Sequence, residues 1–278
     1  MRKMQKSLSN NHSRLISQKA FSIVELLITL TVLGIISVMI MPIVNNGYKR
    51  NTIQTTFADT IREANKGLYS YIISVTSYNA MKDGVPTTKK VQPTMSDGKL
   101  STAAFFKGNT AEKMSSSFNK ARSDSAGWTN CWGGYTVYPN FNMSGTKINL
   151  NDLPCFIDAH NIIYAIETLD SDCSLWLYKE DKNTERKNKL QNSCGILYLD
   201  LNGRKTPNTF GKDIFAFVIT DSPNTYLYPV GGKQMRAIPS GKLNGVGTWE
   251  NSCDETHKDG RTCAGRIIEE NMTITYWR

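Results

Sequence analysis

The sequence predicts an α+β fold, in which a long hydrophobic helix near the N-terminus packs against an antiparallel β-sheet in the C-terminal part of the chain. Three observations predict it. An apolar run over residues 21–44 continues as a stripe of apolar residues at helical spacing to residue 78. A polar stretch without clear periodicity follows over residues 79–130. Short strand-like segments separated by turn residues then occupy residues 131–278.

The composition is that of a folded protein whose positive charge is concentrated at one end. Hydrophobic residues make up 40% of the 278 residues and charged residues 21%, which is ordinary for a globular chain. The formal net charge is +9, but five cations and no acidic residue lie within residues 1–20, which leaves +4 for the rest of the chain. So small a charge argues against nucleic-acid binding, and we predict no specific nucleic-acid partner.

The apolar run predicts a single membrane span. From Ile23 to Val44 there are 22 residues, of which Glu25 is the only strongly polar one. As a helix they extend about 33 Å, enough to cross a hydrocarbon core. The basic residues 1–20 favour the cytoplasmic side, so everything after Val44 is expected to be exported across the inner (cytoplasmic) membrane. A secretory signal would have a shorter apolar run and a small-residue cleavage site, which residues 45–50 lack.

Glu25 requires an explanation beyond plain anchoring, because a carboxylate costs about 2.5–3.5 kcal/mol at the bilayer centre. The junction Lys19-Ala20-Phe21 lies just before it. Counted from Phe21, Glu25 is the fifth residue, Gly34 the fourteenth and Pro42 the twenty-second. With these residues the chain resembles the type IV pilins and type II secretion pseudopilins, which have a basic leader, a small residue and a Phe-led helix with Glu in fifth place.

The strict resemblance covers residues 14–44, and it departs from the family in two ways. Ala20 stands where Gly is usual, and a leader of 20 residues is long. The stretches 194–219 and 260–277 are also similar to globular parts of bacterial pilin-like proteins, with less specific motifs. The alternative to a pilin-like subunit is a single-pass membrane-anchored exported ectodomain with a binding or hydrolase function.

The resemblance implies a sequence of processing and assembly steps. A prepilin peptidase would remove the leader 1–20 by cleavage after Ala20, and the new amine of Phe21 would be N-methylated. The chain would then assemble through residues 21–78 with other pilin or pseudopilin subunits into an extracytoplasmic filament. Its size favours a minor subunit, and pilus, secretion and competence subunits share this N-terminal segment.

The physical chemistry of the segment gives Glu25 and Pro42 distinct parts in assembly. A Phe21 ammonium and a Glu25 carboxylate are each costly to bury alone. Pairing between neighbouring subunits would relieve both costs and fix the register of a filament. Pro42 has no amide hydrogen, so a helix kink or local melting is predicted there.

Helical spacing continues over residues 45–78 as an amphipathic extension. Its apolar stripe is formed by Ile53, Phe57, Ile61, Ala64, Leu68, Ile72 and Val75. Asp59, Arg62, Glu63 and Lys66 occupy the opposite face. Residues 79–130 are predicted to form an irregular connector with one short helix from Thr110 to about Lys120.

The region 131–278 is predicted to form the sheet. The candidate strands are Tyr135–Tyr138, Ile162–Glu167, Leu175–Tyr178, Ile196–Asp200, Ile214–Ile219, Tyr226–Tyr228 and Thr273–Trp277.

All six cysteines lie in this region, after the predicted span. They are Cys131, Cys155, Cys173, Cys194, Cys253 and Cys263. An even number confined to an exported part predicts disulfides, and neighbouring pairs are favoured among the possible pairings. Zinc binding is the competing interpretation, although the sequence has no C-x-x-C and only His160 and His257 could assist.

No catalytic site is predicted. Ser117 and Lys120 match S-x-x-K, but the partner motif K-T-G is absent. Neither His160 nor His257 is beside a recognisable nucleophile motif, and His160 is expected in a turn between strands.

One loop offers oxygen ligands of the kind that calcium prefers. Asp200, Asn202 and Asp213 lie in it, with Asn208 between, and some pilin relatives bind calcium in a loop beside the sheet. The spacing is not that of an EF-hand. We favour the simpler interpretation, a strand-turn-strand connection in which Asp and Asn bond the loop's own backbone, and expect no other cofactor.

Overall fold

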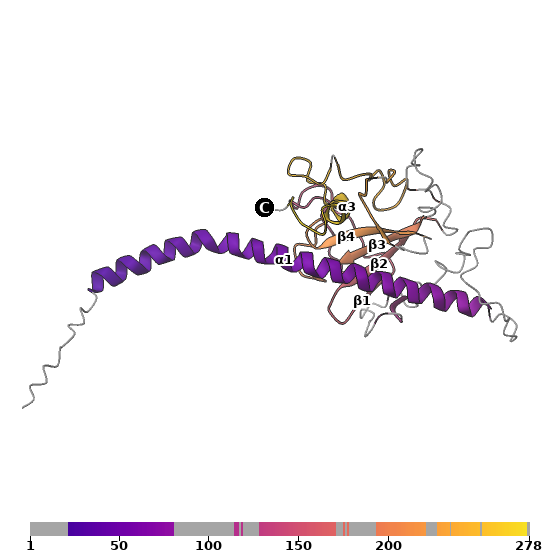
Figure 1. The fold of residues 1–278 in the computed structure, drawn as a ribbon, viewed down its shortest axis with the longest axis horizontal. Coiled ribbons are helices and arrows are strands. Elements are labelled where there is room, and N and C mark those ends of the chain that lie inside the picture. Colours follow the sequence, from indigo (N-terminus) through magenta and orange to yellow (C-terminus); the bar gives the residue numbers. More distant parts are fainter. Residues whose placement is uncertain are drawn as a thin grey trace, which may run out of the picture. The chain divides into compact units, whose positions relative to one another are not determined.

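The computed structural model describes residues 22–80, 114–116, 118, 128–170, 175, 177, 193–220, 227–233, 235–250 and 252–276, without the side chains of residues 42, 43, 46 and 71–80. The chain forms two compact units, residues 1–47 and 48–278. Helix α1, Ile23–Ala80, contributes to both of them (Figure 1). It is continuous over 58 residues, which include the whole predicted amphipathic extension.

Five strands form one antiparallel sheet in the second unit, in the order β1-β2-β3-β4-β5. The strands are β1 Cys155–Ile157, β2 Ile163–Thr168, β3 Ser193–Asp200, β4 Ile214–Thr220 and β5 Leu227–Pro229. Each strand pairs with the strands before and after it in the sequence, so the sheet is a meander. An apolar N-terminal helix together with this sheet confirms the α+β layout.

Four of the predicted strands correspond to β2, β3, β4 and β5. The prediction at Tyr135–Tyr138 is wrong, because this segment forms only isolated bridges, from Val137 to Ile148 and from Tyr138 to Thr209. The prediction at Thr273–Trp277 is also wrong, since the described residues 273–276 form no strand. Leu175 forms one isolated bridge with Ser193, and the short strand β1 was not predicted.

The two central strands are buried on both faces. In β3, Leu197 and Leu199 point into the same cluster as helix α1, whereas Ile196 and Tyr198 point into a second cluster on the other face. Strand β4 alternates in the same way, because successive side chains of a strand point to opposite faces. Burial of both faces explains why these strands are continuous apolar runs in the sequence.

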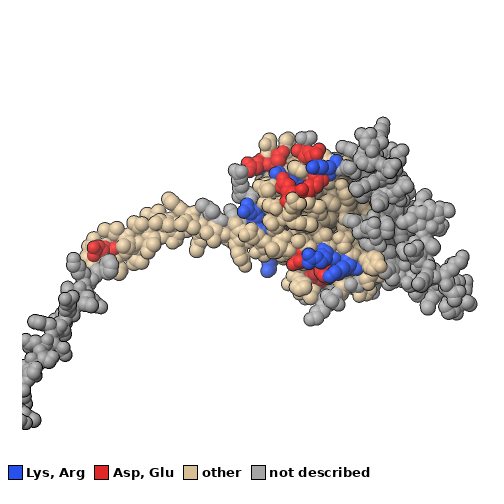
Figure 2. All heavy atoms as spheres, viewed as in Figure 1, with Lys and Arg blue, Asp and Glu red and all other residues tan. Residues whose placement is uncertain are grey.

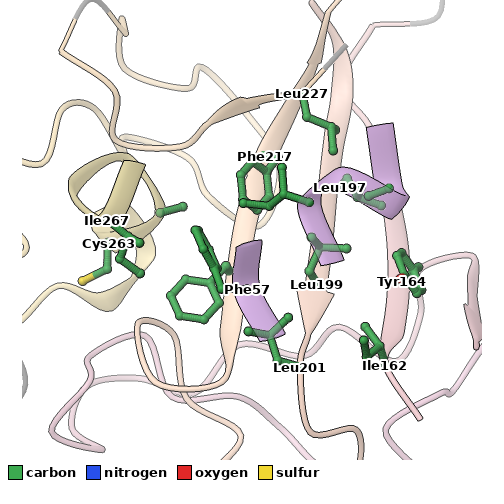
Figure 3. Packing of buried hydrophobic residues seen from close by; sticks show 14 of the residues in the cluster. Phe57, Ile162, Tyr164, Leu197, Leu199, Leu201, Phe217, Leu227, Cys263 and Ile267 are labelled. Atoms are coloured by element: carbon green, nitrogen blue, oxygen red, sulfur yellow. The ribbon is translucent and has the colours of Figure 1, made fainter. Parts of the chain in front are cut away.

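The apolar stripe of α1 from Ile53 to Leu68 packs on the first face of the sheet, as predicted, and the side chains of Ile72 and Val75 lie outside the described ones. Phe57, Ala64 and Leu68 are fully buried, and the Phe57 ring lies 4.7 Å from the ring of Phe215. Figure 3 shows Phe57 among side chains of β3 and β4. The opposite face of α1 carries two exposed ion pairs, Arg62–Asp59 and Lys66–Glu63.

Loops rather than helices cover the second face. Trp132, Leu150, Ile238 and Leu243 are buried there. The buried carboxylate of Glu167 holds one of these loops, since it accepts the Tyr198 hydroxyl at 2.5 Å and the Lys242 amide at 2.8 Å. Such satisfied contacts remove the cost of burying a carboxylate beside an apolar core.

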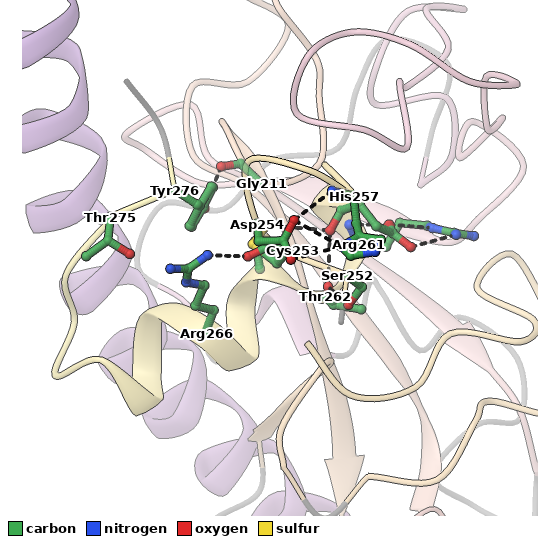
Figure 4. The surroundings of a disulfide bond; sticks show 12 residues. Gly211, Ser252, Cys253, Asp254, His257, Arg261, Thr262, Arg266, Thr275 and Tyr276 are labelled. Atoms are coloured by element: carbon green, nitrogen blue, oxygen red, sulfur yellow. Dashed lines mark hydrogen bonds and ion pairs between the residues drawn. A yellow bond between two sulfur atoms is a disulfide. The ribbon is translucent and has the colours of Figure 1, made fainter. Parts of the chain in front are cut away.

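The last described segment packs beside the sheet through helix α3, Cys263–Glu269, which follows a 3₁₀ turn η2, Gly260–Thr262. No residue larger than glycine fits at Gly265 of α3, because a Cβ there would lie 2.3 Å from the carbonyl carbon of Gly231. Beyond α3, the buried Tyr276 hydroxyl donates to the Gly211 carbonyl at 2.6 Å (Figure 4). This bond fixes the segment against the loop between β3 and β4.

Candidate functional site

The first unit presents an apolar helix with no cover of its own. None of the residues from Ile23 to Met41 is buried, and this stretch is long and apolar enough to cross a membrane by length and composition. In Figure 2 the space-filling surface of this stretch carries a single red group, at its start. The structure thus agrees with the predicted span, and Glu25 is its only acidic side chain.

Glu25 closes a capping box at the start of α1. Its Oε2 accepts the amide of Ser22 at 3.1 Å, and the Ser22 hydroxyl oxygen accepts the amide of Val24 at 3.2 Å. These two bonds satisfy backbone donors that the first turn of a helix leaves unpaired. A carboxylate also interacts favourably with the positive end of the helix dipole. This role was not predicted from the sequence, although the spacing Ser22-x-x-Glu25 is typical of a helix N-terminus.

The capping box leaves Glu25 able to bind a cation. A carboxylate has about four acceptor positions, and the Ser22 amide occupies one of them. Ala20 and Phe21 lie outside the described residues, so cleavage, N-methylation and the pairing with a Phe21 amine remain predictions. Helix α1 runs through position 42 without interruption, and the kink at Pro42 likewise remains a prediction.

The disulfide prediction is confirmed for the described cysteines. Cys131 bonds to Cys155 and Cys253 to Cys263, which are neighbouring pairs in the sequence. Cys194 is also disulfide-bonded. The remaining cysteine, Cys173, lies outside the described residues. The sulfur atoms of the bonded cysteines are therefore not available for zinc.

The loop between β3 and β4 is organised around two buried carboxylates. Asp200 accepts the Trp132 indole N–H at 2.7 Å and the Asn202 amide at 3.1 Å. Asp213 accepts the amides of Asn208 and Thr209 at 2.9 and 2.6 Å, and the side-chain amide of Asn202 at 3.0 Å.

Burial dominates the electrostatics of this pair. It raises the pKa of Asp213 to about 6 even though several N–H groups lower it. Burial, followed by the negative charge of Asp213, also raises the pKa of Asp200 well above its ordinary value. A low dielectric penalises the charged form of each carboxyl, and two neighbouring carboxylates repel one another.

The arrangement fits the strand-turn-strand interpretation of this loop better than a calcium site. The carboxylates of Asp200 and Asp213 accept N–H groups, and Asn202 presents its side-chain nitrogen to Asp213 rather than its oxygen. Buried side-chain oxygens of Asn202 and Asn208 lack a partner, but within the described ranges no three His, Cys, Asp or Glu side chains form a metal-binding group. We therefore assign Asp200, Asn202 and Asp213 to the architecture of the loop.

The two histidines considered in the sequence occupy turns. His160 lies in the turn between β1 and β2, as predicted, where its amide donates to Asp158 at 2.8 Å. The ring of His257 lies 2.9 Å from the carboxylate of Asp254, and the bonds from His257 lower the pKa of this carboxyl (Figure 4). Ser117 and Lys120 lie outside the described residues.

Comparison of the chain with protein-family models, with curated proteins and with solved structures finds no match. The functional interpretation therefore rests on the chain's own residues, above all on the exposed apolar helix and on Glu25 at its start.

Proposed function

We propose that this chain is a prepilin-like subunit, most simply a minor one, of a type IV pilus or a type II secretion pseudopilus. In this proposal it is cleaved after Ala20, N-methylated at Phe21 and assembled through its N-terminal helix. The observation that carries the proposal is the 19-residue apolar stretch of α1 from Ile23 to Met41, in which no residue is buried. The first turn of this stretch contains the carboxylate of Glu25.

The exposed helix supports the proposal because so much apolar surface is not stable in water. The described large hydrophobic side chains from Ile23 to Met41, together with Val44, are 45–79% exposed. A contiguous apolar surface of this kind marks a contact with a membrane or with other chains. A subunit that moves from the membrane into a filament would use the same surface in both places.

The second half of α1 supports the proposal because it joins this surface to a folded body. Phe57, Ala64 and Leu68 are buried against the sheet. Burial of such side chains contributes roughly 1.5–3 kcal/mol each for the large ones. Helix α1 therefore supplies both the exposed apolar stretch and residues that pack on the sheet.

Substitutions of Glu25 test the proposal. In Glu25→Ala, the Phe21 amine of a neighbour would lose its partner in an apolar setting, which costs on the order of 3–5 kcal/mol for a buried pair. We expect normal expression, cleavage and membrane location but no incorporation into filaments. Glu25→Gln should incorporate to an intermediate extent, because it keeps hydrogen bonding without the charge.

Ser22→Ala is the matched control that the capping box provides. It removes the capping hydroxyl, at a cost of about 0.5–2 kcal/mol to the helix start, and leaves the Glu25 charge in place. The measurement is co-purification with sheared filaments or crosslinking to the major subunit. We expect Ser22→Ala to incorporate nearly normally. If Ser22→Ala fails as completely as Glu25→Ala while Glu25→Gln is normal, Glu25 acts only as a cap. Normal incorporation of Glu25→Ala would make a plain anchored ectodomain the better account.

A further inference from the structure

Three asparagines of the chain begin the triplet N-x-S/T, in which the middle residue is not proline. This triplet is the acceptor sequence for N-linked glycans in exported proteins. The three residues are Asn11, Asn142 and Asn271. Asn11 precedes the apolar helix and lies outside the described residues. Because so short a triplet arises easily by chance, the surroundings of Asn142 and Asn271 have to decide whether either could be an acceptor.

Asn142 lies in a loop whose ends are fixed and whose middle is open to solvent. Val137 and Ile148 close the loop by exchanging two backbone hydrogen bonds, of 2.8 and 2.7 Å. Every residue from 142 to 147 is exposed. Such a loop can enter the active site of a modifying enzyme while the core of the sheet unit stays folded.

The triplet at Asn142 forms a turn that presents its side-chain amide. The Met143 amide donates to the Asn140 carbonyl at 2.9 Å, and Met143 has a positive φ of 60°. The Ser144 hydroxyl donates to Oδ1 of Asn142 at 2.6 Å and accepts the side-chain amide of Asn140 at 3.0 Å. This hydroxyl therefore holds the Asn142 amide by its oxygen. Nδ2 of Asn142, the atom that would receive a glycan, has no hydrogen-bond partner among the described residues.

Asn271 is exposed as well, but the chain that follows it is packed against the core. The Met272 amide donates to the Ile267 carbonyl at 2.7 Å, and the Met272 side chain packs on the first core cluster. Ile274 is 2% exposed. An enzyme that draws in the residues after Asn271 would have to break these contacts, at a cost in free energy. The structure therefore favours Asn142.

We propose that Asn142 accepts an N-linked glycan on the exported part of the chain. The proposal rests on the proposed export of the residues after Val44 and adds a modification to it. The donor is an oligosaccharide joined to a membrane lipid through a diphosphate, and the catalyst is a membrane oligosaccharyltransferase. The bond from C1 of the first sugar to the diphosphate oxygen breaks, and a bond from C1 to Nδ2 of Asn142 forms. Nδ2 loses one proton to a base of the transferase, and the lipid diphosphate leaves.

Glycosylation of the purified full-length chain tests the proposal without any dependence on export. The folded chain in detergent is incubated with a diphospholipid-linked oligosaccharide and a transferase that requires only the N-x-S/T triplet. Mass spectrometry then measures the glycan on the tryptic peptides 123–147 and 267–278, which contain Asn142 and Asn271. We expect the folded chain to be modified at Asn142 several-fold more than at Asn271. Denaturation and reduction before the reaction should remove most of this difference, because both triplets are then accessible.

Four variants assign the modification to its atoms. Asn142→Gln should abolish the glycan on peptide 123–147, and Ser144→Ala should reduce it strongly. Ser144→Thr should restore it, because it keeps the hydroxyl that holds the amide. The matched control is Thr146→Ala, which removes an exposed hydroxyl of the same loop from outside the triplet and should change nothing. Circular dichroism checks that each variant keeps the fold.

Two results with the purified chain overturn the proposal. The first is an unmodified Asn142 in the folded chain under conditions that modify it in the denatured chain. The second is a glycan that is kept in Asn142→Gln and lost in Ser144→Ala, since it would then be attached to the serine hydroxyl.

Expression in cells that hold both donor and transferase separates the glycan from the export on which it rests. An intact bridge between Cys131 and Cys155 beside an unmodified Asn142 overturns the acceptor assignment. Reduced cysteines together with an unmodified Asn142 contradict the proposed export instead, and the result with the purified chain then decides the acceptor assignment.

Discussion

Asp200 and Asp213 show how two acidic residues can serve the fold rather than a ligand. Together they bind amides and an indole N–H from three places, namely Trp132, the turn at Asn202 and the segment Asn208–Thr209. A buried carboxylate needs such donors, because its desolvation is otherwise uncompensated. The loop between β3 and β4 is consequently tied to the segment that carries the first disulfide.

This pair makes stability depend on pH in a definite direction. The pKa of Asp213 is about 6 in the folded chain and 3.8 is its ordinary value. Between these values the folded chain holds more protons than the unfolded chain, so the free energy of unfolding falls as pH rises from about 4 to about 6. The raised pKa of Asp200 acts in the same direction. We expect the full-length chain in detergent to melt at a higher temperature at about pH 5 than at about pH 7.

The variant Asp213→Asn is the control for this dependence. It lowers stability at every pH, because its amide must donate where the carboxylate accepts. It also removes one titrating group, so the change in melting temperature between about pH 5 and about pH 7 should shrink. Melting temperatures that rise with pH over this interval in the original chain would contradict the assignment.

Individual residues could be predicted from the sequence where their partners are close in the chain. The bonds of Asp213 to Asn208 and Thr209 follow from turn chemistry. The bond between Ser22 and Glu25 was not predicted, although its spacing is equally local and typical of a helix cap. The bond of Trp132 to Asp200 joins residues 68 positions apart. No local pattern contains that information, because it arises only when the strands have paired.

Among the elements, length and periodicity decided which ones could be predicted. Strands β3 and β4 are long apolar runs, and the stripe of α1 repeats over many turns, so each signal is strong. Strand β1 has three residues, too few to show a period.

In the segment 273–276 the predicted alternation of buried and exposed residues is present, but the predicted strand is not. Ile274 and Tyr276 are buried and Thr275 is exposed, so the predicted alternation exists. The segment nevertheless pairs with no strand. Its Ile274 amide contacts the Gln54 side chain at 3.4 Å, and Tyr276 bonds to Gly211. Alternation therefore reports burial on one side, and it does not report pairing.

The disulfide bonds that join these elements are simple to test. With two neighbouring pairs formed and Cys194 also bonded, we expect the unfolded, unreduced full-length chain to contain no free thiol. Peptide mapping should recover a bridge between Cys173 and Cys194. Six free thiols or stoichiometric zinc would contradict this expectation.

The bridge between Cys253 and Cys263 should also contribute to stability, because it closes a loop with a sequence separation of 10. A loop of this length is stabilised by roughly 2–4 kcal/mol. Cys253→Ser/Cys263→Ser should lower the melting temperature while Cys131–Cys155 stays intact, which mapping of the variant can verify.

At the scale of the whole molecule, the two units differ in how much of their apolar surface is buried. The sheet unit buries both faces of its central strands. The apolar helix of the first unit buries none of its residues, so its stable surroundings must come from a membrane or from other chains. The charge divides in a related way, since five cations precede the helix and the rest of the chain carries +4.

This distribution of charge leads to a testable prediction about residues 1–20. The positive charge of residues 1–20 is expected to keep the start of the helix on the cytoplasmic side, and five cations beside an apolar helix would be costly to bury in the filament that we propose. We therefore expect a prepilin peptidase to cleave after Ala20, so that N-terminal sequencing of membrane fractions begins at Phe21 and mass spectrometry finds one added methyl group. Ala20→Gly should be cleaved at least as fast, because Gly is the residue usual at this junction, whereas a bulky Ala20→Leu should accumulate as precursor. An intact Met1 in cells that hold an active peptidase, or a start well beyond Val44, would exclude this processing. Assembly would then have to proceed without the Phe21 amine that Glu25 is proposed to bind.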